Sequence, residues 1–229
     1  MRLPSDSPRL ASEFNPFEDE YLVEILQAVS LAWARMKHPK TDEIEDRITF
    51  RLAGRLQNDP AFRDIPYDIV PQHWLLDIDG RRLGRLDLRF KHRHSQKDYL
   101  AFESKRLHVR YPGGSIGTEY SVYSGDPGMG AFIEGQYSKD LPTAGMLGYV
   151  MDGDTEKAWS GLTKSISNKR VELRLSGVES LVNSTIALCE KDSLAGTRLG
   201  ESFHDLITRQ LRLFHLLLPV FKKSLDVAK

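Results

Sequence analysis

Residues 84–105 read GRLDLRFKHRHSQKDYLAFESK, and this stretch decides the fold. Apolar and charged residues alternate in its first half, where Leu86, Leu88 and Phe90 occupy every second position. A period of two is typical of a half-buried strand. A polar segment at about 93–97 follows, and a second strand is expected over about 98–109. The stretch therefore predicts an antiparallel hairpin.

The hairpin carries three residues that suggest chemistry. Glu103 and Lys105 are two positions apart, so their side chains project from the same face of a strand. With a turn at 93–97, paired residue numbers sum to 190, which places Asp87 opposite Glu103, with Cβ atoms roughly 5 Å apart. Carboxylates that close repel each other unless a cation lies between them, and Mg²⁺ or Mn²⁺ binds such oxygen ligands. An isolated E-x-K tripeptide, by contrast, is usually part of an ordinary cross-strand salt bridge on a solvated face.

Positive charge is concentrated in the same region. The formal net charge of the 229-residue chain is zero, but residues 81–110 contain ten Lys or Arg and three acids, a net charge of +7. Such a stretch suits a site that cuts phosphodiesters, and it suits equally a solvated hairpin whose basic side chains guard an edge strand. The residues expected to contact nucleic acid are Arg85, Arg89, Arg106 and Lys164.

The rest of the chain predicts one α/β domain over 1–229, with a mixed central sheet flanked by helices and a loose arm at 1–14. Thr41 is the expected N-cap of the second helix, and the glycine-rich segment 111–130 is expected to form short turns or a flap. Two or three strands are expected to fill the end of the chain. The expected helices are at about 16–37, 42–57, 129–138 and 155–173, and the expected strands at about 67–78, 84–91, 98–109, 143–151 and 207–220.

The order of these elements over residues 41–152, together with Asp87 and the Glu103-Ser-Lys105 motif, resembles the PD-(D/E)XK nuclease superfamily, the fold of many restriction endonucleases. The resemblance implies a catalytic core at 41–152 in which Asp87 and Glu103 bind the metal and Lys105 is the catalytic lysine. A helix acid often completes such sites, and Glu45 is the expected residue, with Glu43 behind it. Leu86 stands where the name-giving proline would be.

Three further segments, FESKRL at 102–107, GMGAFIEGQY at 128–137 and GMLGYV at 145–150, are similar to uncharacterised bacterial nuclease-like proteins of restriction and phage-defence type. This similarity suggests that Gln136 and Tyr137 approach the site, with packing as the equal alternative.

The resemblance implies a Mg²⁺-dependent (or Mn²⁺-dependent) endonuclease that hydrolyses phosphodiester bonds in DNA, as the nuclease component of a bacterial anti-phage defence or restriction system. RNA shares the chemistry and stays open as a substrate. The alternative is a catalytically inactive subunit of the same fold that binds nucleic acid or a protein. The zero net charge leads us to expect a protein partner or a homo-oligomer in either case.

The remaining sequence features limit the kinds of site and the cellular location that can be expected. His215 lies inside an apolar run and is expected to be a hydrogen-bonded core residue, whereas His92 and His94 are expected at the exposed hairpin tip. The single cysteine, Cys189, excludes an internal disulfide. The first residues lack the apolar core of a signal peptide, and the longest apolar run, 213–221, is too short to span a bilayer. We therefore expect a cytoplasmic protein without a membrane segment.

Overall fold

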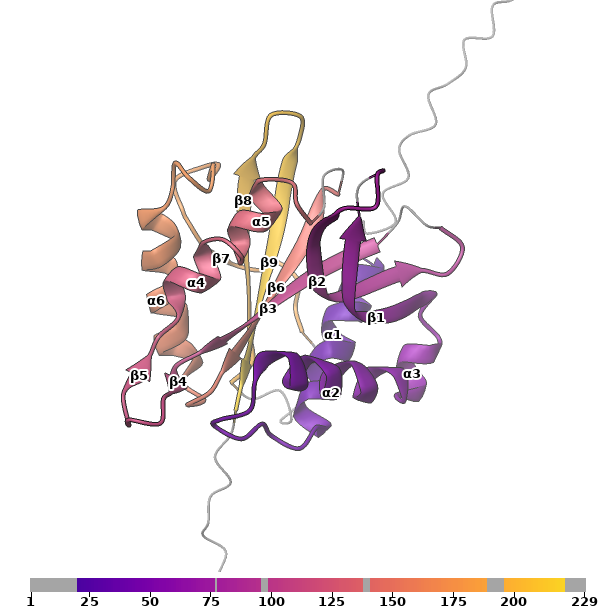
Figure 1. Ribbon diagram of the computed structural model, residues 1–229, viewed down its shortest axis with the longest axis horizontal. Coiled ribbons are helices and arrows are strands. Elements are labelled where there is room, and N and C mark those ends of the chain that lie inside the picture. Colours follow the sequence, from indigo (N-terminus) through magenta and orange to yellow (C-terminus); the bar gives the residue numbers. More distant parts are fainter. Residues whose placement is uncertain (1–19, 77, 96–98, 138–140, 189–195, 221–229) are drawn as a thin grey trace, which may run out of the picture.

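A seven-stranded mixed sheet forms the centre of the protein (Figure 1). The computed structural model describes residues 20–76, 78–95, 99–137, 141–188 and 196–220, so the expected arm at 1–14 and Cys189 lie outside the described residues. The strand order is β1-β2-β3-β6-β9-β8-β7, with β3, β6 and β9 parallel and the other neighbours antiparallel. The strands of this sheet are β1 (Tyr67–Leu76), β2 (Arg82–His92), β3 (Tyr99–Leu107), β6 (Thr143–Val150), β7 (Val182–Asn183), β8 (Arg198–Asp205) and β9 (Gln210–Pro219).

Helices cover both faces of the sheet. One face carries α1 (Glu20–Arg35), α2 (Glu45–Gln57) and α3 (Pro60–Arg63). The other carries α4 (Tyr120–Ser124), α5 (Met129–Ile133) and α6 (Thr155–Asn168), and Figure 1 shows the two groups on opposite sides. A separate two-stranded ribbon, β4 (Val109–Arg110) and β5 (Ile116–Gly117), follows β3. The expected mixed sheet flanked by helices is confirmed. No helix in the described ranges has the length and apolarity needed to cross a membrane.

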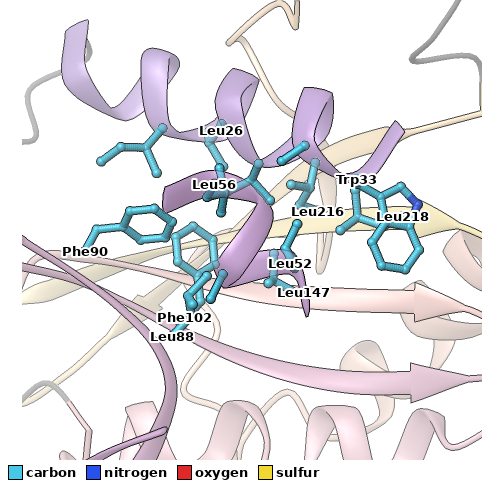
Figure 2. Close-up of a cluster of buried hydrophobic side chains, with 14 of the residues drawn as sticks. Leu26, Trp33, Leu52, Leu56, Leu88, Phe90, Phe102, Leu147, Leu216 and Leu218 are labelled. Atoms are coloured by element: carbon cyan, nitrogen blue, oxygen red, sulfur yellow. The ribbon is translucent and has the colours of Figure 1, made fainter. Parts of the chain in front are cut away.

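The larger core lies between the sheet and the first three helices (Figure 2). Leu52 and Leu56 of α2 pack between α1 and the sheet, and each fully buried leucine contributes about 1.5–3 kcal/mol to stability. Trp33 of α1 stacks on Tyr149 with ring centroids 5.1 Å apart, and its indole Nε1 donates to the carbonyl of Pro219, 2.8 Å away. These contacts fix α1 and α2 across the middle strands, and so fix the start of α2.

The predicted hairpin register is confirmed. Leu88 pairs with Phe102 and Phe90 with Leu100, so paired numbers sum to 190. The strand expected at 207–220 is present as β9, and it lies inside the sheet between β6 and β8.

Several boundaries differ from expectation: the helix expected at 129–138 ends at Ile133, and the helix expected at 155–173 ends at Asn168. Two further differences have a local reason. The second helix begins at Glu45, and the predicted cap Thr41 was wrong, because the Glu43 carboxylate accepts the backbone N–H of Lys40 and closes a turn ahead of the helix. The third strand ends at Leu107, because His108 adopts a left-handed φ of 57° that breaks the extended backbone.

A chain of buried polar groups crosses the second core. His204 Nδ1 lies 2.7 Å from the Leu173 carbonyl oxygen, so this nitrogen carries the hydrogen and Nε2 accepts from Ser202 Oγ at 2.7 Å. His215 Nε2 then donates to Ser202 at 2.8 Å, and the Tyr123 hydroxyl donates to His215 Nδ1 at 3.0 Å. Every partner is satisfied with both imidazoles neutral, and the expectation that His215 is a hydrogen-bonded core residue is confirmed.

This network predicts acid sensitivity. Burial lowers the pKa of His204 to about 4 and that of His215 to about 3. Between pH 6.5 and 4 these histidines are therefore protonated in the unfolded chain but neutral in the folded protein. The stability that the two neutral histidines contribute is therefore fully present above pH 6.5, and it is lost as the pH falls toward 4. We expect the difference in unfolding free energy between wild type and His215→Gln to narrow by about 1.4 kcal/mol per pH unit below 6.5.

Urea denaturation at pH 7, 6 and 5 measures this difference, since the other titrating groups are common to both proteins and cancel. A difference that stays constant over this range would contradict the neutral assignment of His215.

Candidate active site

The candidate site lies where β2 and β3 separate. Their ladder pairs end at Leu88 and Phe102, and the next residue of β2, Asp87, turns its carboxylate toward β3. Asp87 Oδ2 accepts two hydrogen bonds, from the backbone N–H of Ser104 at 2.8 Å and from its hydroxyl at 2.6 Å. The side chain of Asp87 therefore replaces the backbone bond that a regular hairpin would have made. Asp87 is only 4% exposed.

The other oxygen of Asp87 is held from β1. Gln72 Nε2 donates to Asp87 Oδ1 over 3.0 Å. Gln72 has φ 53° in the middle of a strand, a left-handed conformation that costs a non-glycine residue of order 1 kcal/mol and is concentrated at functional sites. Its Oε1 is buried and has no hydrogen-bond partner among the described residues. The strained backbone thus serves to aim an amide at Asp87.

Glu103, Lys105 and Glu45 form the rest of the cluster. The Lys105 ammonium contacts Glu103 Oε1 directly, lies 3.5 Å from Glu45 Oε1 and donates to the Ser104 carbonyl at 2.9 Å. Glu45 stands in the first turn of α2, and its second oxygen accepts the backbone N–H of Arg106 at 2.8 Å. The structure therefore brings Asp87, Glu103, Lys105 and Glu45 together. Glu43 lies behind and pairs with Arg51 at 2.7 Å.

Burial strongly perturbs the charges in this cluster. Desolvation, aided by Asp87 and opposed by Lys105, raises the pKa of Glu103 to about 9. Burial also raises the pKa of Glu45, although Lys105 opposes it. Burial lowers the pKa of Lys105, but Glu103 and Glu45 outweigh this and raise it above its ordinary value. The lysine is therefore charged and the cluster holds more acids than it can neutralise.

One observation indicates that these residues could bind a divalent cation. Glu103 Oε2 is buried and has no hydrogen-bond partner within the described part of the chain, although a buried carboxylate oxygen normally accepts hydrogen bonds. Asp87 and Glu45 supply further oxygen donors of the kind Mg²⁺ and Mn²⁺ prefer. Among the described residues, no three acids, histidines or cysteines are already drawn together as a metal cage, because Lys105 occupies the space beside Glu103 and Glu45.

A pocket of about 260 Å³ opens beside the cluster. It lies between the start of α2, the end of β3 and the segment that leads through the β4–β5 ribbon into α4. Glu45, Lys105 and Arg106 form its inner wall. Its outer wall is formed by Val109, Tyr111, Glu119, Val122 and Pro127. Of the cluster, Glu45 and Lys105 are thus reached from solvent through this pocket, next to the positive charge of Arg106.

The expected nucleic-acid contacts are only partly brought to this cleft. Arg106 lines it, whereas Arg85 is not among its lining residues and pairs with Asp46 at 3.0 Å. Arg89 lies over the ring of Tyr99, with its guanidinium 4.1 Å from the centroid, and bonds His73. Lys164 is exposed on α6 and does not line the pocket.

Tyr137 approaches the site, whereas Gln136 is exposed. Burial raises the pKa of the Tyr137 phenol, and the nearby charges of Glu103 and Asp87 raise it further. A Cβ added at Gly84 would lie 2.6 Å from the Tyr137 ring, so glycine at 84 makes room for it.

Sequence reasoning missed two residues of the site, Gln72 and Ser104. Ser104 also lies 2.9 Å from the Thr49 hydroxyl, which is 3.0 Å from that of Tyr149, so a buried polar chain links Asp87 to α2 and β6. Ser104 breaks the apolar run of Leu100 and Phe102 on its face of the strand, and that break was the available signal. For Gln72 the sequence carries no comparable signal.

A scan of protein-family models and searches of curated proteins and of solved structures return no match to this chain. Its function must therefore be argued from the geometry of the cluster.

The strained Gln72 yields a prediction that separates function from folding. Gln72→Gly removes the amide and relieves the left-handed strain, so we expect unfolding stability to stay within about 1 kcal/mol of wild type. Asp87 loses one of its three donors, so we expect Mn²⁺ to raise the melting temperature less than in wild type.

Arg174→Gly is the matched control. Arg174 also has a left-handed backbone, with φ 51°, and it pairs with Glu134 away from the cluster. An equal Mn²⁺ response in wild type and Gln72→Gly would show that Gln72 has no role in positioning Asp87.

Proposed function

We propose that this protein is a metal-dependent phosphodiesterase that cuts nucleic acid, with DNA as the favoured substrate. The observation that supports it best is the buried cluster itself: one lysine lies among three carboxylates, and Glu103 Oε2 has no hydrogen-bond partner among the described residues. Such a cluster adds little or nothing to stability, because desolvating charges costs more than pairing them returns. Strongly perturbed groups in a cleft are typical of functional sites.

The arrangement of the elements supports the nuclease interpretation. A helix that supplies Glu45 precedes the β1–β2–β3 meander, and the crossover to the parallel strand β6 follows. The PD-(D/E)XK superfamily has this order, with the acidic residue and the E-x-K motif on neighbouring strands. The proposal extends to Asp87, Glu103 and Glu45 as metal ligands and to Lys105 as the catalytic lysine. A role in bacterial anti-phage defence stays a prediction of the resemblance.

Each side chain has a defined task in this proposal. When bound, a divalent cation polarises a phosphate oxygen and acidifies a water molecule. Asp87, fixed on both oxygens by Ser104 and Gln72, would present its remaining lone pair in a constant direction. Lys105, no longer held by Glu103 and Glu45, would orient the attacking water or stabilise the negative charge that develops on the phosphate. Arg106 in the pocket wall would contact the strand's phosphates.

Loss of the lysine charge should abolish cleavage. We expect Lys105→Met, which keeps the length of the side chain, to slow Mg²⁺-dependent cleavage at least about 100-fold, and Asp87→Ala to slow it similarly. The assay is cleavage of supercoiled plasmid, single-stranded DNA and tRNA, with near-UV circular dichroism to verify folding. Lys157→Ala, which changes an exposed lysine on α6, is the control and should cut like wild type.

Full activity of the folded Lys105→Met protein would remove Lys105 from the mechanism. If wild type cuts nothing and Mn²⁺ does not raise its melting temperature, the better description is a catalytically inactive subunit of this fold. Mn²⁺ stabilisation without cutting would point instead to a missing protein partner.

The raised pKa of Glu103 predicts a pH-dependent metal affinity. Below pH 9 the Glu103 carboxyl is largely protonated, so a cation must displace a proton to bind it. We expect the Kd for Mn²⁺, measured by electron paramagnetic resonance titration, to fall about tenfold per unit between pH 6 and pH 8. In Glu103→Gln the affinity should be weaker and its pH dependence flatter. An affinity for Mn²⁺ that is the same at both pH values would argue against Glu103 as a ligand.

A further inference from the structure

The end of the β1–β2 hairpin exposes an aromatic ring between basic side chains. Trp74 is 44% exposed, although large apolar residues of a globular protein are usually buried. The Arg82 guanidinium lies 4.3 Å from the centroid of the Trp74 ring and that of Arg85 lies 5.7 Å from it. Leu76 and Leu83 extend the surface and are 57% and 51% exposed. In Figure 1 this hairpin lies at the edge of the sheet, clear of the helices around α6.

A continuous line of contacts joins this surface to the candidate site. Trp74 is the cross-strand partner of Arg85, and Arg85 pairs with Asp46 at 3.0 Å. Asp46 follows Glu45, which contacts Lys105 at 3.5 Å. Along β2, Arg85 is two residues from Asp87, which corresponds to about 7 Å. The cross-strand partner of Trp74 is therefore close enough to Asp87 for one bound strand to pass both positions.

The charge of the surface favours a nucleic acid as its occupant. Arg81, Arg82 and Arg85 lie within five positions of one another, and no acid stands between them. Charged side chains near a sheet edge can prevent pairing with a strand of another molecule. This role explains the arginines but does not explain an exposed tryptophan between them. An aromatic ring with stacked guanidinium groups is a flat cationic surface, and this is the surface on which unpaired bases stack.

We propose that Trp74, with Arg82 and Arg85, stacks a base of an unpaired strand and thereby guides the neighbouring phosphate to Asp87, Glu103 and Lys105. This inference rests on the proposed nuclease function and narrows its substrate to single-stranded or locally unpaired nucleic acid. A base inside an intact duplex presents no free face to the ring, so the surface selects against paired substrate.

The test measures binding without cleavage. Fluorescence anisotropy of a labelled single-stranded oligonucleotide and of a duplex of the same sequence is recorded with full-length protein in EDTA at low salt. We expect wild type to bind the single strand more tightly than the duplex. Trp74→Leu, which keeps an apolar side chain but removes the ring, should weaken single-strand binding between about fivefold and about a hundredfold. Trp74→Phe should retain most of it, and Arg82→Gln should weaken it.

Trp159→Leu provides the matched control. Trp159 on α6 also lies under an arginine, with Arg198 3.9 Å from its ring centroid, but it belongs to the other helical layer. The control should bind like wild type. Equal single-strand binding by wild type and Trp74→Leu, an equal loss in the control, or no oligonucleotide binding by wild type would overturn the proposal. So would a dimer in sedimentation velocity that Trp74→Leu dissociates, because the surface would then be a protein interface.

These outcomes are independent of the nuclease proposal, since EDTA prevents metal-dependent cutting. Single-strand binding that depends on Trp74, in a protein that never cuts, would refute the enzyme and keep the stacking surface. Cleavage that requires Lys105 but is unchanged in Trp74→Leu would keep the enzyme and refute the stacking surface.

Discussion

The pair of hydrogen bonds from Ser104 to Asp87 is the constraint on which the candidate site depends. A regular hairpin would continue its backbone ladder past Leu88 and Phe102, and no space would remain between the strands. Here the carboxylate of Asp87 accepts the backbone N–H that the ladder leaves free, so β2 and β3 separate without an orphaned donor. Two residues further along β3, the backbone N–H of Arg106 is likewise accepted by a side chain, the carboxylate of Glu45 at the start of α2. Two acids thus accept the backbone N–H groups that the opened strand leaves free, and one of them, Glu45, also lines the pocket.

The charges in the cleft are costly, and this cost argues for a function. Glu45, Glu103 and Asp87 outnumber Lys105, and burial raises the pKa of Glu103 to about 9 rather than leaving it as an ordinary ionised acid. Apolar residues of similar volume would pack there at least as stably. Gln72 adds backbone strain to the same place. The excess of buried acids over Lys105 is the cost that a bound cation, as proposed above, would relieve.

Much of this could be predicted from the sequence, because its signals were local. The period of two predicted the strand, the turn expected at 93–97 predicted the register, and the register placed Asp87 beside the E-x-K strand. Glu45 was expected from the resemblance, because an acid on the preceding helix often completes sites of that kind. The start of α2 was wrong by three residues, because a Glu43 side chain bonding back to Lys40 leaves no mark on periodicity. The left-handed backbone of Gln72 depends on a partner fifteen residues away and no local propensity indicates it.

The two cores explain why the strain falls at this point. Leu86 packs in the core of α4–α6 and Leu88 in the core of α1–α3, although residues two apart on a strand normally share a face. β2 must therefore rotate at Asp87, which directs that side chain into the gap beside β3 instead of toward either helical layer. Gln72 lies opposite this point on β1, between the pairs Pro71–Leu88 and His73–Leu86. Its left-handed φ lets β1 follow the rotation and keep pairing on both sides. The strain at Gln72 and the direction of Asp87 are consequently one feature, set by how the two helical layers divide the residues of a single strand.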